Sequence, residues 1–542
     1  MRRGEYHDSV TLMVAGRAVA AVPGVARALV AMGTELNVSL LETLGYAPPD
    51  AGPGDLIIAF SCPDPGTESA ALAALAASLS PAGSITAHGH PSPDQPLPRT
   101  TGTALGRTSA PLTLISTPGL AAVPDAMESL QYGASVVIFS DNVPLHHEIR
   151  LKEEAGRRNL LVMGPDCGTV VLHGTGLGFT NATRPGPISL VAASGTGAQH
   201  LMSLLHTAGT GIRHCLGVGG RDLTQAVAGR STHAALDALA EDDETELIAV
   251  VSKPPHPAVA QSIEDHARRL KKPVLFAFIG DDHPTLTETA ERILTTLGHP
   301  SPTPWPHWPP TDRTRAAPDS RNRGRTIRGL FSGGTLCAEA EVVLTRMRAR
   351  LLEERLPGER LLEERSLEER LLEGRLPQER LLEERLPQER SGGRGEGESR
   401  ELHIAQPTPT GPHSAAPFAP FPFTSDLTDF GDDAYTQGRP HPMIDNTLRL
   451  RAIAEAAEDA RVGVLLLDVV LGRVAHADPA GELVPALGAA RARGAAIVIS
   501  LCGTDGDAQG LERQARAIAD AGAWVYLSNA EAAAAAGRLA QR

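Results

Sequence analysis

The chain has few cysteines, few aromatic residues and no excess of basic side chains. Its five cysteines are scattered over 542 residues, are odd in number and form no C-x-x-C pair. Neither a disulfide framework nor a zinc site is therefore predicted, and a reducing, cytoplasmic location is expected. Aromatic residues make up 3% of the chain and the formal net charge is −14. This charge argues against a surface that binds nucleic acid or an anionic membrane.

Long hydrophobic runs are also lacking. No run approaches the roughly 20 apolar residues that a membrane span needs. Near the N-terminus an apolar stretch covers residues 10–16, but Asp8 precedes it and Arg17 ends it. We expect a short strand there (residues 9–14) rather than a signal peptide.

What the sequence does contain is a repeated alternation of apolar β-rich runs with amphipathic helical patterns. This alternation predicts an α/β protein with parallel sheets that carry ligands at the carboxyl ends of their strands. Proline-rich stretches separate the folded regions. The expected division is a small α/β domain (1–80), a linker (81–109), α/β domains at 110–183 and 184–298, a second linker (299–325), a further α/β region (326–347 and 424–542), and a low-complexity insertion (348–423).

The most informative stretch is one βαβ unit between residues 186 and 222. An apolar run (188–192) leads into the turn Ser194-Gly195-Thr196-Gly197 and then into a helical pattern. The glycines allow a close approach of the backbone, and the following helix begins with unpaired N–H groups and the positive end of its dipole. The turn therefore predicts a phosphate or carboxylate site. A tight turn without a ligand is the structural alternative, because the turn matches neither G-x-G-x-x-G nor the Walker sequence.

The same pattern occurs a second time. A strand (327–331), the turn Ser332-Gly333-Gly334-Thr335 and a helix (336–347) repeat the order of the first unit. We therefore predict two related α/β regions, in which both turns begin helices. Between them, residues 351–390 repeat Leu, Glu and Arg with a period of five, which builds no continuous helix face, so a solvated insertion is expected.

Further polar turns follow predicted strands. Gly219-Gly220 ends one such strand, and the clustering of turns of this kind favours a site over simple connections. The loop 430–445 holds Arg439, His441 and Asp445, which offer a bidentate anion clamp and a titratable pair. A capped turn that satisfies its own backbone is the alternative for this loop.

Several motifs carry a resemblance to a known family. G-P-D-C-G-T, A-S-G-T-G and G-V-G-G-R-D have the order and spacing found in the α subunit of succinyl-CoA synthetase. F-S-D-N-V-P, S-G-G-T-L-C-A-E-A and G-D-D-A-Y-T-Q-G-R-P-H-P-M-I-D resemble, more closely, the FdrA family of acyl-CoA synthetase-like proteins. The resemblance spans nearly the whole chain apart from the linkers and the insertion.

This resemblance implies Rossmann-like and flavodoxin-like parallel-sheet domains of the succinyl-CoA synthetase type. It also implies coenzyme A as cofactor. The synthetase's phosphorylated histidine segment is replaced here by F-I-G-D-D-H-P-T, with V-S-K-P-P in place of the accompanying glutamate segment. No ATP-binding region and no metal site are found in the sequence. The residues expected at the cofactor are Phe139, Ser140, Asp141, Asp166 and Cys167.

Three functions remain open at this point. The first is an acyl-CoA ligase-like enzyme in which the turns at Ser194–Gly197 and Ser332–Thr335 aim N–H groups at an acyl phosphate. The second is a subunit of an oxamate carbamoyltransferase that uses carbamoyl phosphate in ureide catabolism, an activity associated with the FdrA family. The third is a non-catalytic scaffold. In each enzymatic case we expect a small carboxylate or acyl or carbamoyl phosphate as substrate, and other subunits or a second copy as partners.

Overall fold

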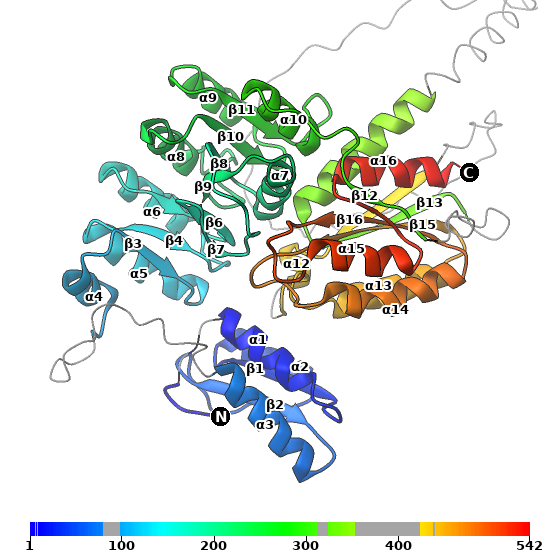
Figure 1. Ribbon diagram of the computed structural model, residues 1–542. Coiled ribbons are helices and arrows are strands. Elements are labelled where there is room, and N and C mark those ends of the chain that lie inside the picture. The colour runs from blue at the N-terminus through cyan, green and yellow to red at the C-terminus, as the bar shows by residue number, and fades with distance from the viewer. Residues whose placement is uncertain are drawn as a thin grey trace, which may run out of the picture. The chain divides into compact units, whose positions relative to one another are not determined.

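The computed structural model describes residues 1–5, 7, 9–79, 98–311, 324–352, 423–436 and 439–541. Met1–Met347 and Phe423–Arg542 form one compact unit, which contains every element labelled in Figure 1. The repeat expected at 351–390 falls almost wholly outside the described residues. Within the described part of the chain, no helix is both long and apolar enough to cross a membrane.

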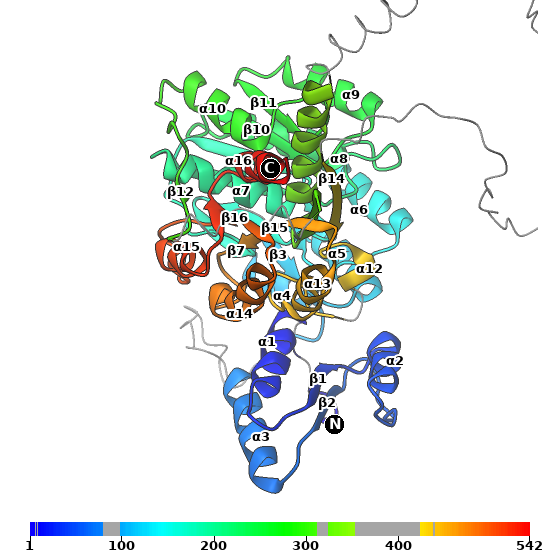
Figure 2. The same ribbon diagram turned by 90° about the vertical axis from the view of Figure 1, so that its right-hand side faces the viewer.

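The N-terminal domain places helices against a two-stranded antiparallel sheet. The strand expected at 9–14 is wrong, because this stretch is helical. Leu12, Ala15 and Val19 recur at helical spacing and are all buried, and this face packs on the sheet beside the last helix of the domain (Figure 2). The elements are α1 (Ser9–Ala20), β1 (Arg27–Met32), α2 (Glu35–Thr43), β2 (Leu56–Ser61) and α3 (Pro65–Leu79).

The next region is a three-stranded parallel sheet in the order β3-β4-β5. A helix, α4, precedes it within the segment expected to be linker; Thr100 caps this helix by accepting a hydrogen bond from the Thr103 N–H. Helices cross over between the parallel strands, as such connections require. The elements are α4 (Thr101–Thr108), β3 (Leu112–Ile115), α5 (Gly119–Gln131), β4 (Ser135–Ile138), α6 (Leu145–Arg157) and β5 (Val162–Met163).

A six-stranded sheet follows, in the order β11-β10-β8-β9-β6-β7. Its four strands β8 to β11 are parallel, and β6 and β7 extend it as an antiparallel hairpin. Every residue of β8 is buried, as expected for a central strand covered on both faces. The elements are β6 (Thr169–Leu172), β7 (Thr175–Gly178), β8 (Ile188–Ala192), α7 (Gly195–Thr207), β9 (Ile212–Gly217), α8 (Arg230–Glu241), β10 (Leu247–Ser252), α9 (Pro257–Ala267), β11 (Val274–Phe278) and α10 (Leu286–Thr296).

The C-terminal sheet also has six strands, in the order β12-β17-β16-β15-β13-β14. All its pairs are parallel except the short strand β12 beside β17. In Figure 1, α16 lies on one side of this sheet and α13 and α14 on the other. The elements are β12 (His307–Trp308), β13 (Thr326–Phe331), a helix at 334–352, β14 (Thr424–Asp429), α12 (Asp433–Thr436), α13 (Thr447–Glu458), β15 (Val462–Val470), α14 (Pro479–Ala492), β16 (Ala496–Cys502), α15 (Leu511–Asp520), β17 (Trp524–Tyr526) and α16 (Asn529–Ala540).

The two large sheets share one topology. Numbered from β8, the first has neighbouring strands in the order 2-1-3-4, and numbered from β13 the second has the order 2-1-3-4-5. This is the flavodoxin-like order, whose ligand site lies where the strand order reverses, between strands 1 and 3. The prediction of two related regions whose turns begin helices is confirmed, since α7 follows Ser194 and the helix 334–352 follows Ser332-Gly333.

Candidate functional site

The carboxyl ends of parallel strands from three sheets surround a cavity of about 460 Å³. Gly197 and Asp445, both predicted as site residues, do not line it. The predicted residues that do line it are Phe139, Ser140, Asp141, Asp166, Cys167, Ser194, Gly195, Thr196, Gly219, Gly220, Ser332, Gly333, Gly334, Thr335, Arg439 and His441.

The first turn, at Ser194, leaves backbone donors open to this cavity. Ser194 has an extended backbone, and its hydroxyl caps α7 by accepting the Gly197 N–H at 3.0 Å. The N–H groups of Gly195 and Thr196 have no acceptor among the described residues. A Cβ on Gly195 would lie 3.1 Å from Thr169 Oγ1, so a larger side chain there has little room. This helix start therefore offers two free donors and the positive end of its dipole.

The second turn, at Ser332, is capped differently. Asp468 in β15 accepts the N–H groups of Ser332 at 2.7 Å and of Gly333 at 2.8 Å, and also the Ser332 hydroxyl. The expectation that Ser332 and Gly333 present N–H groups to a ligand is therefore wrong. Burial raises the pKa of Asp468, and the nearby Arg449 guanidinium opposes that shift.

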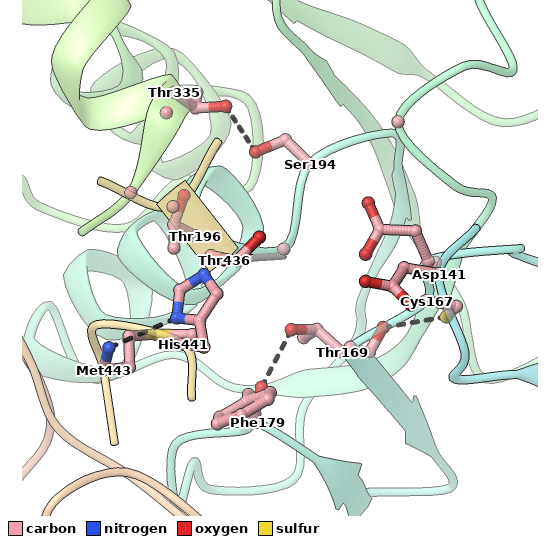
Figure 3. Close-up of a pocket in the computed structure, with 18 of the residues that line it drawn as sticks. Asp141, Cys167, Thr169, Phe179, Ser194, Thr196, Thr335, Thr436, His441 and Met443 are labelled. Atoms are coloured by element: carbon pink, nitrogen blue, oxygen red, sulfur yellow. Dashed lines mark hydrogen bonds between the residues drawn. The ribbon is translucent and has the colours of Figure 1, made fainter. Parts of the chain in front are cut away.

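The two helix starts meet in the cavity. Ser194 Oγ and Thr335 Oγ1 share a hydrogen bond of 2.5 Å (Figure 3). A Cβ on Gly333 would lie 2.8 Å from Thr196 Oγ1, and a Cβ on Gly197 would lie 2.9 Å from Thr335 Cγ2. The glycines thus allow the close approach of two positive helix ends, which is favourable only where an anion or buried carboxylate balances them.

Two charged side chains at this junction were missed by the sequence reasoning. Lys253 directly follows β10, and Asp429 is the last residue of β14. Lys253 Nζ lies 3.6 Å from Asp429 Oδ2. Burial raises the pKa of Asp429, while the Lys253 ammonium opposes that shift. For Lys253 the available signal was a charged residue immediately after the buried strand β10.

The loop at 439–445 contributes His441 but not the predicted pair. His441 Nδ1 accepts the Met443 N–H at 3.2 Å, and Nε2 lies beside Gly431. Burial lowers the pKa of His441 to about 4, so the neutral ring carries its hydrogen on Nε2. Asp445 instead accepts the Thr447 N–H at the start of α13. The predicted titratable pair of His441 and Asp445 is therefore wrong, and the loop supplies a neutral donor.

The opposite wall holds the residues expected at coenzyme A. Phe139 stacks on Phe179 with ring centroids 5.9 Å apart. Burial raises the pKa of the Cys167 thiol to about 12, so this thiol is not a nucleophile at neutral pH. Gly219 has φ +88°, and a Cβ there would lie 2.5 Å from the Pro165 carbonyl oxygen. Only glycine fits at position 219, which explains why the first residue of the Gly219-Gly220 pair is glycine.

A buried ionic network holds this wall in place. Lys152 Nζ donates to Glu148 at 2.9 Å, to Asp222 at 2.8 Å and to the Val218 carbonyl at 2.9 Å. These three side chains are essentially inaccessible to solvent. Arg221 joins the network through an ion pair with Glu148 and a hydrogen bond that it donates to the Val143 carbonyl. The network connects α6 to the residues that flank the turn Gly219-Gly220. No sequence motif predicted it.

Family comparisons agree with this architecture. Residues 330–539 match the CoA-ligase family model. Residues 1–94 match the N-terminal domain described as "AllF, heavy metal-associated domain".

The second description names a metal, but the donors among the described residues do not fit one. Within the described residues no group of three or more His, Cys, Asp or Glu side chains is placed to hold a metal ion. Cys62 is the one cysteine in residues 1–94. A heavy-metal site in this domain would normally require more than one soft ligand.

Relatives of known sequence cover different shares of the chain. The succinate–CoA ligase (ADP-forming) subunit alpha of Methanothermobacter thermautotrophicus is 29% identical over 173 residues, which is 31% of this chain and 56% of that subunit. A solved structure, PH0766 from Pyrococcus horikoshii OT3, covers 80% of this chain and 83% of its own at 14% identity, with a TM-score of 0.27, from which no functional conclusion follows. The uncharacterized protein YahF of Escherichia coli (strain K12) is 31% identical over 550 residues, 95% of this chain and 93% of YahF. The chain therefore belongs to the family of YahF, and within it residues 330–539 match the CoA-ligase model and a shorter stretch resembles the α subunits of succinate–CoA ligase.

Proposed function

We propose that the chain transfers an acyl group between phosphate and the thiol of coenzyme A. The observation that carries this proposal is the meeting of two helix N-termini in one cavity, where Gly195, Thr196, Gly334 and Thr335 leave N–H groups free. Such donors stabilise a phosphoryl oxyanion without giving up a proton. In this proposal the region of the sheet β3-β4-β5 forms the coenzyme A side, and the two flavodoxin-like regions form the phosphate side.

The turn at Gly219-Gly220 leaves room for an extended ligand chain on the coenzyme A side of the cavity. A Cβ placed on Gly220 would meet nothing closer than Asp166 Oδ2 at 3.9 Å and Ala193 O at 4.0 Å, so this wall leaves space for a chain to pass. Phe139, Ser140 and Asp141 would hold it from the neighbouring strand end. Coenzyme A, when bound, supplies the thiol that takes the acyl group; the electron pair of the broken acyl C–O bond leaves with the phosphate, which also takes the thiol proton.

The chain's own residues hold the reacting anion. The backbone donors at Gly195 and Thr196 bind the phosphoryl oxygens, and the Nε2–H of neutral His441 adds a further donor. Because His441 Nδ1 already accepts the Met443 N–H, no ring nitrogen has a lone pair free to attack phosphorus. This supports direct transfer between two bound ligands rather than transfer through a phosphohistidine at this position.

Carbamoyl transfer is the second candidate, favoured by this lack of a nucleophilic ring nitrogen. Carbamoyl phosphate is itself an acyl phosphate and would use the same anion site. The family comparisons point to CoA ligases and give this candidate no support. A subunit partner or second copy, and a cytoplasmic location, remain predictions.

The decisive test compares two variants of the full chain. Gly195→Val puts a side chain against Thr169 and into the cavity, and we expect it to abolish binding of inorganic phosphate. Ser194→Ala removes the α7 cap at a cost of about 0.5–2 kcal/mol of stability but keeps the N–H groups of the turn, so phosphate binding should persist. Calorimetry with phosphate makes the comparison. Unchanged binding by Gly195→Val would remove this turn from the site.

A second assay separates the two candidate reactions. Phosphate release is followed with acetyl phosphate plus coenzyme A, and separately with carbamoyl phosphate plus oxamate. Release that depends on coenzyme A supports acyl transfer to the thiol. Release only in the oxamate arm would replace it with carbamoyl transfer.

A further inference from the structure

We propose that Lys253 is the cationic contact of the phosphoryl group and that Asp429 positions its ammonium over the junction of the two helix starts. This inference rests on the proposed function and adds to it the residue that supplies the charge. Neither side chain was among the residues predicted at the site, although Lys253 lies in the V-S-K-P-P segment.

The strand order places Lys253 at the ligand position of the fold. It follows β10, which is the third strand in sequence and lies beside β8, the first. The reversal of strand order between these two strands opens the crevice in which flavodoxin-like sheets bind ligands. Ser194 follows β8 and Lys253 follows β10, so the two lie on either side of that crevice.

The side chain of Lys253 then extends to the second helix start. A Cβ on Gly334 would overlap both Lys253 Nζ and Asp429 Oδ2, so the ion pair lies directly on the first residue of the helix 334–352. Gly334 is one of the two residues of this turn whose N–H groups Asp468 leaves free. The ammonium and the free backbone donors therefore face the same space.

The ion pair with Asp429 leaves N–H donors of the Lys253 ammonium available to a ligand. The Nζ–Oδ2 distance of 3.6 Å is longer than a good hydrogen bond, and the Lys253 side chain is half-exposed. An ammonium has three donors and is a compact point charge suited to phosphate. Asp429 is largely buried and is itself fixed by the Gly431 N–H at 2.9 Å, which makes it a firm anchor. Lys253 keeps its proton throughout and acts by charge alone.

Charge removal at Lys253 tests the proposal in the full chain. Lys253→Met should weaken the binding of inorganic phosphate by roughly ten- to a hundredfold, the loss expected for one charge-assisted contact. Lys253→Arg keeps the charge and should lie closer to wild type than to Lys253→Met. Lys271→Met removes an exposed charge outside the cavity and serves as the matched control. Binding by Lys253→Met equal to that of the Lys271 control would overturn the proposal.

Asp429→Asn separates positioning from proton transfer. Asparagine keeps an acceptor for the Gly431 N–H but removes a negative charge beside the anion, so phosphate should bind at least as tightly as to wild type. Turnover of acetyl phosphate with coenzyme A should fall, because Lys253 loses its anchor, and the KM for acetyl phosphate should change with it. Loss of turnover at all phosphate-donor concentrations with unchanged KM would instead assign Asp429 a proton-transfer role and refute positioning.

Failure of this inference is distinguishable from failure of the proposed function. If Gly195→Val abolishes phosphate binding and Lys253→Met does not change it, the anion site stands and the assignment of Lys253 is wrong. If neither variant changes phosphate binding, both proposals fail.

Discussion

Ser252 and Asp468 occupy equivalent positions in the two related sheets. β8 pairs with β10 so that Ala192 faces Val251, and β13 pairs with β15 so that Leu330 faces Leu467. The next residues along β10 and β15 are Ser252 and Asp468. Ser252 is buried, uncharged and leaves the α7 donors free, whereas Asp468 takes the N–H groups of Ser332 and Gly333, which directly precede the other helix. Ser252→Asp should therefore convert the first turn into a copy of the second.

The magnitude follows from the contacts that Asp468 makes. An aspartate at 252 would accept the N–H groups of Ser194 and Gly195, as Asp468 accepts those of Ser332 and Gly333. The ligand then loses one charge-assisted hydrogen bond, about 1.5–3 kcal/mol. It also faces a negative charge, which at ~4 Å and an effective dielectric of 20 costs up to ~4 kcal/mol. A combined loss of about 3 kcal/mol, within the range of these two terms, corresponds to roughly a 150-fold weaker affinity for phosphate.

The assay is calorimetric titration with inorganic phosphate at pH 8. The basic pH keeps the new carboxyl ionised, because burial raises the pKa of a carboxyl group. Ser252→Asn introduces a side chain of the same size as aspartate but without its charge, so it serves as the control for steric effects. Thermal unfolding of both variants shows whether they are folded. Equal phosphate affinity of the Asp and Asn variants would refute the equivalence of the two turns and with it the assignment of α7 as the anion-binding end.

The remaining predictions concern titration. Burial raises the pKa of Glu339 to about 7 from 4.5, so its contribution to stability is complete below pH 4.5 and is lost as the pH rises to 7. Glu339→Gln should therefore gain unfolding free energy relative to wild type between pH 5 and 7.5 in urea titrations, and parallel pH curves would contradict this. Burial lowers the pKa of His441 to about 4, so ¹⁵N NMR of the ring should show a neutral imidazole with its hydrogen on Nε2 above pH 5; a midpoint near 6.5 would contradict it.

Much of the fold could be predicted because local patterns encode it. Strand–turn–helix units such as 188–207 carry apolar runs, small turn residues and helical periodicity within one continuous stretch. The N-terminal helix α1 was not predicted, because its sequence carries no such clear local pattern. Its apolar run is short and bounded by charges, and only packing against β1 and α3 shows that Leu12, Ala15 and Val19 form a helical face.

The site could be predicted only in part. Residues at strand ends with glycine-rich turns were found, and most of them line one cavity. Lys253 and Asp468 were missed because their roles depend on which strands become neighbours. Asp468 lies 136 residues from Ser332 along the chain, yet β13 and β15 pair directly. No local pattern contains that pairing. Since β8 and β10 pair in the same way, the two turns differ in the donors they leave free because the second sheet has Asp468 where the first has Ser252.

The chemistry of the cavity favours transfer between two bound ligands, because three potential nucleophiles on its described walls, Cys167, Ser194 and His441, are held in unreactive forms. The Cys167 thiol has a pKa raised by burial to about 12. The Ser194 hydroxyl accepts the Gly197 N–H and is paired with Thr335, and no base lies beside it in the hydrogen-bond network. His441 presents a hydrogen rather than a lone pair. Other lining groups donate without losing a proton: backbone N–H groups, the Nε2–H of His441, the Arg439 guanidinium and the Lys253 ammonium. Groups of this kind stabilise a leaving phosphate, and they leave the attack to a nucleophile that the substrate itself must bring.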